Sequence, residues 1–263
     1  MNPSYPSTLT HDQWELLESL IPDAKPGGRP RTVDMKAVVN AILYILCAGC
    51  AWRMLPSDFP AWKTVYHYFR AWRIDGTWER INHTLHQWVR VSQDRHPSPS
   101  AAILDSQSVK TATPAAIEVG YDAAKHIKGR KRHLLVDTLG LVLMVVVTAA
   151  HVPERAGAKL VLARLHQVRH WVERLVVIWV DGGYKGQEMM QWVMNCYRWL
   201  FQTVLRRDNV KGFVPIAQRW KVERTFGWFN WCRRLSKDYE ILPQTSEAFI
   251  YIANIRLMLR QLA

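Results

Sequence analysis

Apolar residues recur with helical spacing through the first part of the chain. In the segment 9–22 they stand at positions 14, 17, 20 and 21, and Thr10 precedes them as a candidate N-cap. Similar patterns predict three more helices, over 33–50, 61–76 and 77–93. Stretches rich in proline and glycine separate the first three of these segments. The pattern therefore predicts a small all-helical domain over residues 1–93.

The pattern changes after a polar, proline-containing linker at 94–100. Apolar runs rich in β-branched residues now alternate with helical patterns, which is typical of a central sheet covered by helices. The predicted strands cover 101–109, the two halves of 132–151 around Leu139-Gly140, 175–180 and 198–207. The predicted helices cover 154–168, 187–195, 218–240 and 246–262. Residues 101–263 are thus expected to form a second domain of mixed α/β class.

Two of the predicted strands run directly into a carboxylate. AAILDSQSV places Asp105 at the end of one apolar run, and LVVIWVDGG places Asp181 at the end of another. An acid at the end of a buried strand is costly unless a positive group meets it. A lone aspartate of this kind commonly caps the next turn, and that interpretation of Asp181 stays open. Two such acids on neighbouring strands would instead lie side by side, about 4.8 Å apart between strands, and could share a cation.

A third acid lies on a predicted amphipathic helix. Glu223 shares a face with Arg219, whereas Val222, Phe226 and Phe229 form an apolar stripe. If the polar edge of this helix lies over the strand ends, three carboxylates converge. Such an all-oxygen set suits Mg²⁺ or Mn²⁺ and does not suit zinc. Paired ions of this type serve phosphoryl transfer, so the pattern indicates chemistry on a phosphodiester.

The charge of the chain agrees with a polyanionic partner. The net charge is +13, and residues 101–263 carry +11 of it, with 24 basic and 13 acidic residues. This excess favours nucleic acid, although membrane-surface proteins share it. The tract KHIKGRKRH at 125–133 holds five of these cations, which we expect to contact DNA phosphates: Lys125, Lys128, Arg130, Lys131 and Arg132. Lys110 and Lys185 follow the two aspartates closely and are further candidates.

The helical domain offers its own candidates for DNA contact. The helices predicted over 61–76 and 77–93 fit a helix-turn-helix unit, with Lys63 and Arg70 on the first of them. A plain helical bundle with a solvated basic face fits the same residues, and the sequence leaves both interpretations open.

At these residues the chain resembles bacterial DDE transposases of the insertion-sequence-five type. The resemblance runs from about residue 8 to 263 and rests on combined motifs: GCAWRMLPSDFPAWKTVYHYFRAWRIDGTWERI, ILDSQSVKT, YDAAKHIKGRKRHLLVDTLGL, WVDGGYKG and RWKVERTFGWFNWCRRLSKDYE. It implies a ribonuclease H-like mixed sheet flanked by helices, with Asp105, Asp181 and Glu223 as catalytic, metal-binding acids. It also implies Mg²⁺ or Mn²⁺, expected as two ions, and transposition at terminal inverted repeats of double-stranded DNA.

One motif of related transposases is incomplete. Arg219 and Glu223 match its R-x-x-x-E half, but Ile216 stands at its tyrosine position and Asn230 at its lysine position. Arg233 and Arg234 are candidates to supply the missing charge, and with Arg219 they complete the set of predicted DNA contacts.

The competing functions share parts of this pattern. A regulator that binds DNA without cutting it would not need three clustered acids, and a hydrolytic nuclease would use the same acids without strand transfer. The chain shows no membrane-spanning run and no signal-peptide pattern, so we expect a cytoplasmic, nucleoid-associated protein. Because two element ends must be brought together, we expect a homodimer or a higher oligomer.

Overall fold

The computed structural model describes residues 5–24, 27, 30–204 and 219–263. Its first part contains four α-helices, as the pattern predicted: α1 (His11–Glu18), α2 (Met35–Ala48), α3 (Trp62–Ile74) and α4 (Thr77–Ser92). A short 3₁₀ turn, η1 (Trp52–Met54), lies between α2 and α3. Thr10 caps α1 in a full capping box with Gln13. Gly49 ends α2 with a φ of 72°, a conformation that glycine adopts without strain.

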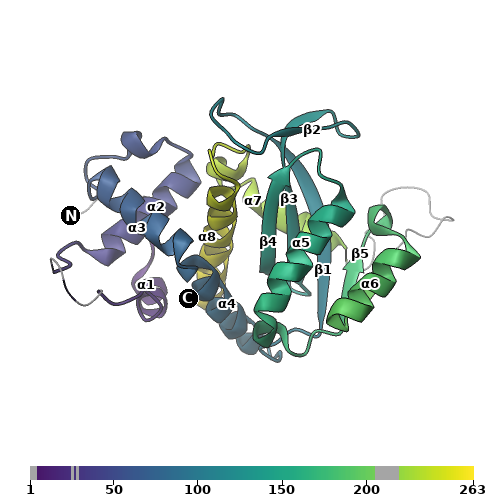
Figure 1. Ribbon diagram of the computed structural model, residues 1–263. Helices are drawn as coiled ribbons and strands as arrows, with labels where there is room; N and C mark the ends of the chain where they lie inside the picture. The colour runs from purple at the N-terminus through teal and green to yellow at the C-terminus, as the bar shows by residue number, and fades with distance from the viewer. Residues whose placement is uncertain (1–4, 25–26, 28–29, 205–218) are drawn as a thin grey trace.

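A six-stranded mixed sheet forms the second part (Figure 1). Its strands are β1 (Ala101–Lys110), β2 (Gly120–Asp122), β3 (Ile127–Asp137), β4 (Val142–Ala149), β5 (Val177–Val180) and β6 (Leu200–Thr203). The central strand β1 pairs antiparallel with β3 and parallel with β5, and β6 continues the parallel side. Both β2 and β4 pair with the far edge of β3.

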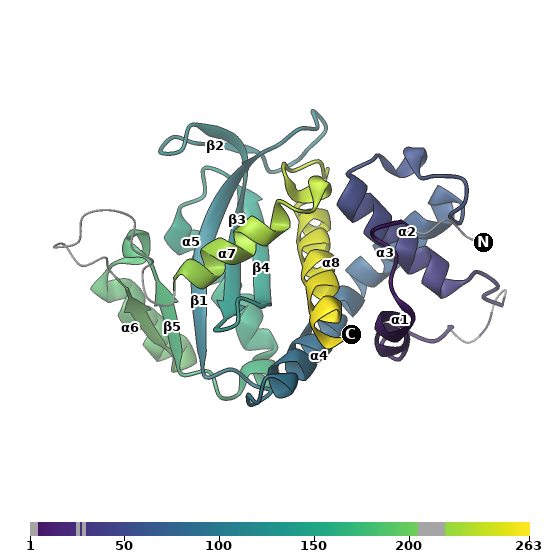
Figure 2. The ribbon, with the colours of Figure 1, turned by 180° about the vertical axis from the view of Figure 1, so that it is seen from behind.

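Helices cover both faces of this sheet. Helix α5 (Glu154–Gln167) lies on one face, and α7 (Trp220–Phe229) crosses the opposite face over β1 and β3 (Figure 2). Helix α6 (Gln187–Tyr197) packs beside β6. Short 3₁₀ turns follow α5, β5 and α7: η2 (Arg169–Val172), η3 (Gly182–Tyr184) and η4 (Arg233–Leu235). Strand β1 therefore presents alternate side chains to a different helix on each face.

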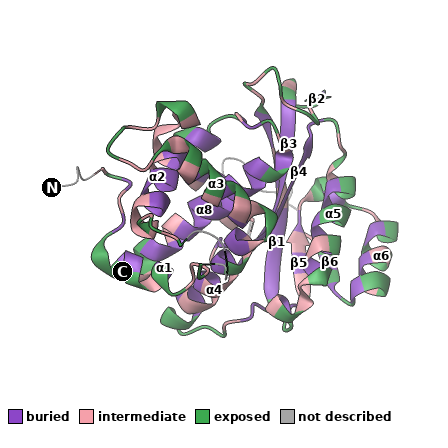
Figure 3. Ribbon diagram, turned by 60° about the vertical axis from the view of Figure 1, so that its left-hand side comes forward, coloured by how far each residue is buried: buried purple, intermediate pink, exposed green. Residues whose placement is uncertain are grey.

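The last helix joins the two parts of the molecule. Helix α8 (Pro243–Leu262) is buried along most of its length and packs against β4 and against α1, α2, α3 and α4 (Figure 3). Its apolar side chains and those of α2–α4 belong to the same hydrophobic cluster as Ile103 of β1 and Phe226 of α7. The N-terminal helices therefore share a core with one face of the sheet.

The structure differs from the sequence expectations in several elements, and β3 begins at Ile127, ahead of the strand predicted from 132. Strand β2 was not predicted, because three residues carry no readable periodicity. The helix expected over 218–240 is also wrong in extent, since α7 ends at Phe229 and the chain turns through η4. Arg132 of β3 holds the backbone that follows α7, since its guanidinium donates to the carbonyls of Leu235 and Lys237 at 2.9 and 3.3 Å. In a continuous helix those carbonyls would be bonded within the helix. The end of the strand predicted over 198–207 lies outside the described residues.

Candidate active site

The pairing of β1 with β5 brings the two strand-end aspartates together. In this parallel pair Ala101 faces Val177 and Ile103 faces Trp179. The same register, continued two residues further, sets Asp105 level with Asp181. Because β5 ends there while β1 continues, the acids stand at the point where the two strands separate.

Asp181 uses its two oxygens differently. Oδ1 accepts a hydrogen bond of 2.8 Å from the backbone N–H of Gly183 and thereby caps the short turn η3. Oδ2 faces Arg219, 3.6 Å from its guanidinium. The simple capping role and the shared-cation role are therefore both present in one residue.

A single guanidinium nitrogen lies among all three predicted acids. Nη2 of Arg219 is 3.8 Å from Oδ2 of Asp105, 3.6 Å from Oδ2 of Asp181 and 3.7 Å from Oε1 of Glu223. Arg219 directly precedes α7, and Glu223 follows one turn later on the same face. The crossing of α7 over β1 thus places one cation between two strand acids and one helix acid.

Burial makes the ionised form of these carboxyl groups unfavourable unless a positive charge lies nearby. Burial raises the pKa of the Asp105 carboxyl to about 6, and the charges of Asp181 and Glu154 add to this increase. The N–H of Ser106, which donates to Oδ1 of Asp105 at 2.7 Å, and the charge of Arg219 act in the opposite direction. The donors are all oxygen, which fits Mg²⁺ or Mn²⁺.

The carboxylates stand around Arg219 and not at coordination distance from each other. Across the described ranges, no three His, Cys, Asp or Glu side chains are drawn together closely enough to hold a metal ion. The guanidinium lies in the space between the acids. A divalent ion bound by all three would have to take over that space and displace Arg219.

A fourth acid, which the sequence analysis did not identify, lies next to this cluster. Glu154 is the first residue of α5, and its Oε1 accepts a hydrogen bond of 3.1 Å from the hydroxyl of Ser106. A Cβ added to Gly183 would clash with Oε2 of Glu154 and would lie 3.1 Å from Oδ1 of Asp181. An acid in the first turn of a helix is common, so its type and position gave no distinctive signal.

The basic tract of β3 is mostly buried, which corrects part of the predicted DNA surface. Arg130 is fully buried and bonds to Asp238 and to backbone carbonyls, including those of Ile117 and Ile241. Arg132 is also buried, and its guanidinium donates to backbone carbonyls of the segment that follows α7. Nζ of Lys131 lies 3.2 Å from Asp122. These three side chains therefore face protein partners and do not reach the surface as phosphate contacts.

Arg234 is corrected for the same reason. Its side chain is buried, with Nε 2.6 Å from Glu240 and a hydrogen bond of 2.9 Å to the carbonyl of Cys50. It fixes the segment after α7 and does not replace the missing lysine of the motif. Asn230 is exposed at the end of α7, and Ile216 lies outside the described residues.

The remaining predicted DNA contacts are exposed, and the structure does not bring them to one place. Lys63 and Arg70 lie on α3, and Lys185 follows η3. Lys110 and Lys128 line one open groove near β2, together with Tyr121 and His126. The exposed set consists of Lys63, Arg70, Lys110, Lys125, Lys128, Lys185 and Arg233.

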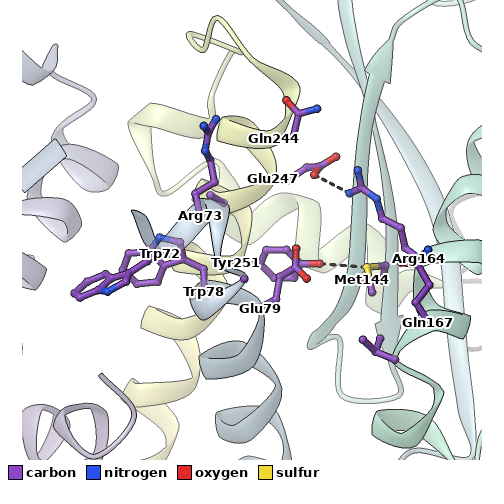
Figure 4. A pocket seen from close by; sticks show the side chains of 13 residues that line it. Trp72, Arg73, Trp78, Glu79, Met144, Arg164, Gln167, Gln244, Glu247 and Tyr251 are labelled. Atoms are coloured by element: carbon purple, nitrogen blue, oxygen red, sulfur yellow. Dashed lines mark hydrogen bonds and ion pairs between the residues drawn. The ribbon is translucent and has the colours of Figure 1, made fainter. Parts of the chain in front are cut away.

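The pocket shown in Figure 4 is separate from the three predicted acids. It has a volume of about 270 Å³ and lies where α3, α4, α5, β4 and α8 meet. The ion pair between Arg164 and Glu247, 2.7 Å long, forms part of its wall, and neither Arg219 nor any of the three predicted acids lines it. Of the charged side chains on its wall, Arg164 and Glu247 pair with each other and Arg73 donates to the hydroxyl of Thr245 at 2.7 Å, whereas burial raises the pKa of Glu79.

Comparisons with known proteins identify the family of the chain. Residues 96–258 match the family described as "Transposase DDE domain", and residues 9–82 match "Putative transposase of IS4/5 family". The match over 96–258 covers the sheet and α5–α8, and it identifies the mixed sheet as ribonuclease H-like.

Two relatives from Burkholderia cepacia are similar over parts of the chain. The "Insertion element IS402 uncharacterized 16.2 kDa protein" is 30% identical over 110 residues, which are 39% of this chain and 72% of that protein. The "Putative transposase for insertion sequence element IS402" is 25% identical over 126 residues, 46% of this chain and 59% of that protein. No solved structure gives a significant match.

Proposed function

The chain belongs to the DDE transposases of the IS4/5 type, and from this we propose that Asp105, Asp181 and Glu223 are its catalytic acids. The family cleaves DNA at the ends of an insertion sequence and transfers the freed strand into target DNA. The observation that carries the residue assignment is the convergence of the three carboxylates on one guanidinium nitrogen. Residues from two strands and one helix meet there, although 118 positions separate the first from the last.

The family uses a divalent metal, and the three acids are the residues that would hold it. We assign Mg²⁺ or Mn²⁺, as two ions, because the donors are carboxylate oxygens. Such ions, when bound, activate the attacking oxygen and stabilise the leaving one. The chain itself orients the donors: the Gly183 N–H fixes one oxygen of Asp181, and the Ser106 N–H fixes one oxygen of Asp105. The positive charge of Arg219 offsets part of the negative charge of the three acids until a cation enters.

We assign the DNA contacts to exposed cations, some of which lie near this site. Lys125 and Lys185 lie on segments next to the acids, and Lys110 and Lys128 share a groove further along the sheet. Such side chains hold backbone phosphates and add salt dependence more than sequence selectivity. Lys63 and Arg70 on α3 extend this set to the helical domain at 1–93, which we assign to recognition of the terminal repeats.

Oligomerisation completes the proposal. Transposition joins two element ends, so the working complex requires at least two copies of the chain.

Across the described ranges, no helix is long and apolar enough to cross a membrane.

A cleavage assay tests the assignment of the acids. Asp181→Asn should abolish Mg²⁺-dependent cleavage of a plasmid carrying the gene's own flanking DNA, because it removes the negative charge while the amide oxygen can still cap Gly183. DNA binding, measured by gel shift, should persist. Glu188→Gln is the matched control, since Glu188 is exposed in the first turn of α6.

The products separate the competing functions. Cuts at both flanks followed by joined products indicate a transposase, whereas cuts without joining indicate a hydrolytic nuclease. An Asp181→Asn protein that still cuts would show that these acids are not the catalytic site. Binding without cleavage by the parent protein would favour a regulator.

A further inference from the structure

The open groove beside β2 combines two cations with an exposed aromatic ring. We call it the β2 groove; it has a volume of about 620 Å³ and is lined by Lys110, Lys128, Tyr121 and His126, among others. It lies away from the three acids, none of which lines it. Its wall therefore forms a second polar surface on the catalytic domain.

The two lysines of the β2 groove have free charges. The neighbouring Lys125 and Lys131 each lie within 4.0 Å of an acid. Neither Lys110 nor Lys128 has an ion-pair partner in the part of the chain that the structure describes, and the described residues that line the groove include no carboxylate. Two exposed and unpaired cations at one groove attract an anionic ligand, and a phosphate is the anion that a DNA substrate supplies.

Tyr121 adds an aromatic face to these charges. It stands directly opposite Lys128 in the register of β2 and β3, and it is 52% exposed. Its hydroxyl lies 3.1 Å from Nδ1 of His126, in hydrogen-bond contact. His126 has a φ of 52°, a conformation that costs a residue other than glycine free energy. Because the hydroxyl already has a partner, the part of Tyr121 that remains for a ligand is its ring.

The rest of the groove wall is largely apolar. Pro114, Val119 and the alanines at 112 and 116 line it. Backbone phosphates are held by charge and gain nothing from an apolar wall. A base that has left the duplex stack presents a planar face, which an aromatic side chain can cover. A nucleotide with its base against Tyr121 and its phosphate near the lysines would use both kinds of wall.

The β2 groove lies at a defined distance from the acids. Lys110 follows Asp105 by five positions in β1, which is about 17 Å at the rise of a strand. Paired residues share a face of the sheet, so the registers place Tyr121 and Lys128 on the same face as Asp105. This is the face that α7 crosses (Figure 2). At about 3.4 Å per stacked nucleotide, the groove is about five nucleotides from the acids.

We propose that the β2 groove binds an unpaired nucleotide of the DNA substrate, with its base stacked on Tyr121 and its phosphate contacted by Lys110 and Lys128. This inference rests on the proposed function, since it takes the cleaved DNA as the ligand. A single-stranded tail beside the cut would reach the groove while the reacting phosphate lies at the acids. Tyr121 is thus a binding residue for the DNA end and takes no part in breaking the bond.

Equilibrium binding of DNA to the full-length protein tests the proposal without turnover. The probes are fluorescein-labelled duplexes of the gene's own flanking sequence, either blunt or with a single-stranded tail of about five thymidines. Fluorescence anisotropy in the absence of divalent ions measures both affinities. Tyr121→Ala should bind the tailed duplex about tenfold more weakly than the parent does, because it loses a stacking side chain. It should bind the blunt duplex as the parent does.

Two matched variants separate stacking from other effects. Tyr121→Phe keeps the ring and loses only the hydroxyl, so it should bind the tailed duplex nearly as tightly as the parent. Ile117→Ala removes an exposed apolar side chain from the same segment that does not line the groove, and it should bind both probes as the parent does. Thermal unfolding of Tyr121→Ala should match that of the parent, since the side chain is exposed.

Photo-cross-linking of the parent protein needs no variant at all. A 5-iodouracil in the tail forms a covalent adduct with an aromatic side chain stacked on it when the complex is irradiated. Mass spectrometry of the digested complex should locate this adduct on Tyr121. Adducts found only on residues outside the β2 groove would overturn the proposal, whether or not Tyr121→Ala folds.

The outcomes for the β2 groove and for the proposed function are distinct. If Tyr121→Ala binds the tailed duplex as the parent does, the groove proposal is overturned, while Mg²⁺-dependent cleavage by the parent still supports a transposase. If the parent binds the tail through Tyr121 but never cuts DNA, the groove stands and the proposed cleavage fails. Equal weakening on blunt and tailed duplexes would show that Tyr121 contacts paired DNA, which also overturns the unpaired nucleotide.

Discussion

Arg219 partly offsets the charge of the three proposed catalytic acids. Its nitrogen lies within 3.8 Å of each carboxylate, in the space that a shared cation would take. A divalent ion entering the site must therefore compete with the guanidinium. The same residue matches the R-x-x-x-E motif and is also a predicted DNA contact.

Substitution of Arg219 should change metal affinity in a defined direction. Arg219→Gln should bind Mn²⁺ about thirtyfold more tightly, because a unit charge about 4 Å from a divalent cation costs about 2 kcal/mol even in water-like surroundings. Mn²⁺ resonance titration measures this, with Arg233→Gln as a control on an exposed cation. An unchanged affinity would mean that displacing the guanidinium from the acids has no measurable cost in binding free energy, which would contradict the prediction.

His133 shows how burial removes a residue from acid–base chemistry. It lies on β3 under α5, with Nε2 3.0 Å from the hydroxyl of Thr148. A Cβ on Gly157 would overlap its ring, so α5 packs directly on it. Burial lowers the pKa of His133 to about 3, and the charges of Lys131 and Lys125 contribute. The imidazole is therefore neutral in the folded protein at neutral pH.

This shift predicts a loss of stability in mild acid. Below pH 6.5 the unfolded chain takes up a proton on His133, whereas the folded chain does not until about pH 3. The stabilisation is complete above pH 6.5, and at pH 5 about 2 kcal/mol of it is lost. His133→Gln should reduce the difference in unfolding free energy between pH 8 and pH 5 by about that amount. Urea denaturation at both pH values measures it, and an equal difference in both proteins would contradict the prediction.

At the scale of elements, two glycines have opposite roles. Gly227 lies in α7, and a Cβ there would meet no atom within 4 Å. Glycine at this position therefore makes no contact that requires it, and it loses more backbone entropy on folding than alanine would. Gly129 lies in β3, where a Cβ would overlap the carbonyl oxygen of Val109 on β1. The close approach of these two strands requires glycine at that position.

Alanine at each glycine should separate these roles. Gly227→Ala should stabilise the protein by about 0.5–1 kcal/mol through helix propensity. Gly129→Ala should destabilise it by more than about 1 kcal/mol, because the strand pair must move apart. Urea unfolding of both variants beside the parent gives the comparison. A destabilised Gly227→Ala protein would contradict this prediction.

At the scale of the whole molecule, a buried charged cluster connects the helical domain to the sheet. Asp137, at the end of β3, is fully buried and bonds to Arg90 and to His86 of α4, the latter at 3.2 Å. The backbone N–H groups of Leu139 and Leu141 donate to its other oxygen at 2.8 and 3.0 Å. One carboxylate thus organises both the β3–β4 turn and the packing of α4.

Loss of this charge should destabilise both parts together. Asp137→Asn leaves Arg90 buried without a counter-charge, which typically costs about 3–5 kcal/mol. We expect a single, lowered unfolding transition by circular dichroism and by intrinsic tryptophan fluorescence. Asp23→Asn, at an exposed position, is the control. Two separate transitions would mean that the helical domain and the sheet unfold independently despite their shared core.

The sequence predicted the elements that carry strong periodicity and the acids that end them. Asp105 and Asp181 were recognisable because a carboxylate after a buried apolar run is unusual, and Glu223 because it lies beside an apolar stripe. The basic tract at 125–133 was misjudged in part, since a count of charges does not show which side chains are buried. Glu154 gave no signal, because acids in first helical turns are frequent.

The sequence by itself determined which segments form helices and strands and which chemistry their ends can support. Periodicity is a local property, written within each run of residues. Only the tertiary structure decided how the charges are paired. Arg130 bonds to residues more than 100 positions away, and Arg219 joins acids from β1, β5 and α7. Such pairings depend on long-range packing, which brings buried charges to partners that no local pattern records.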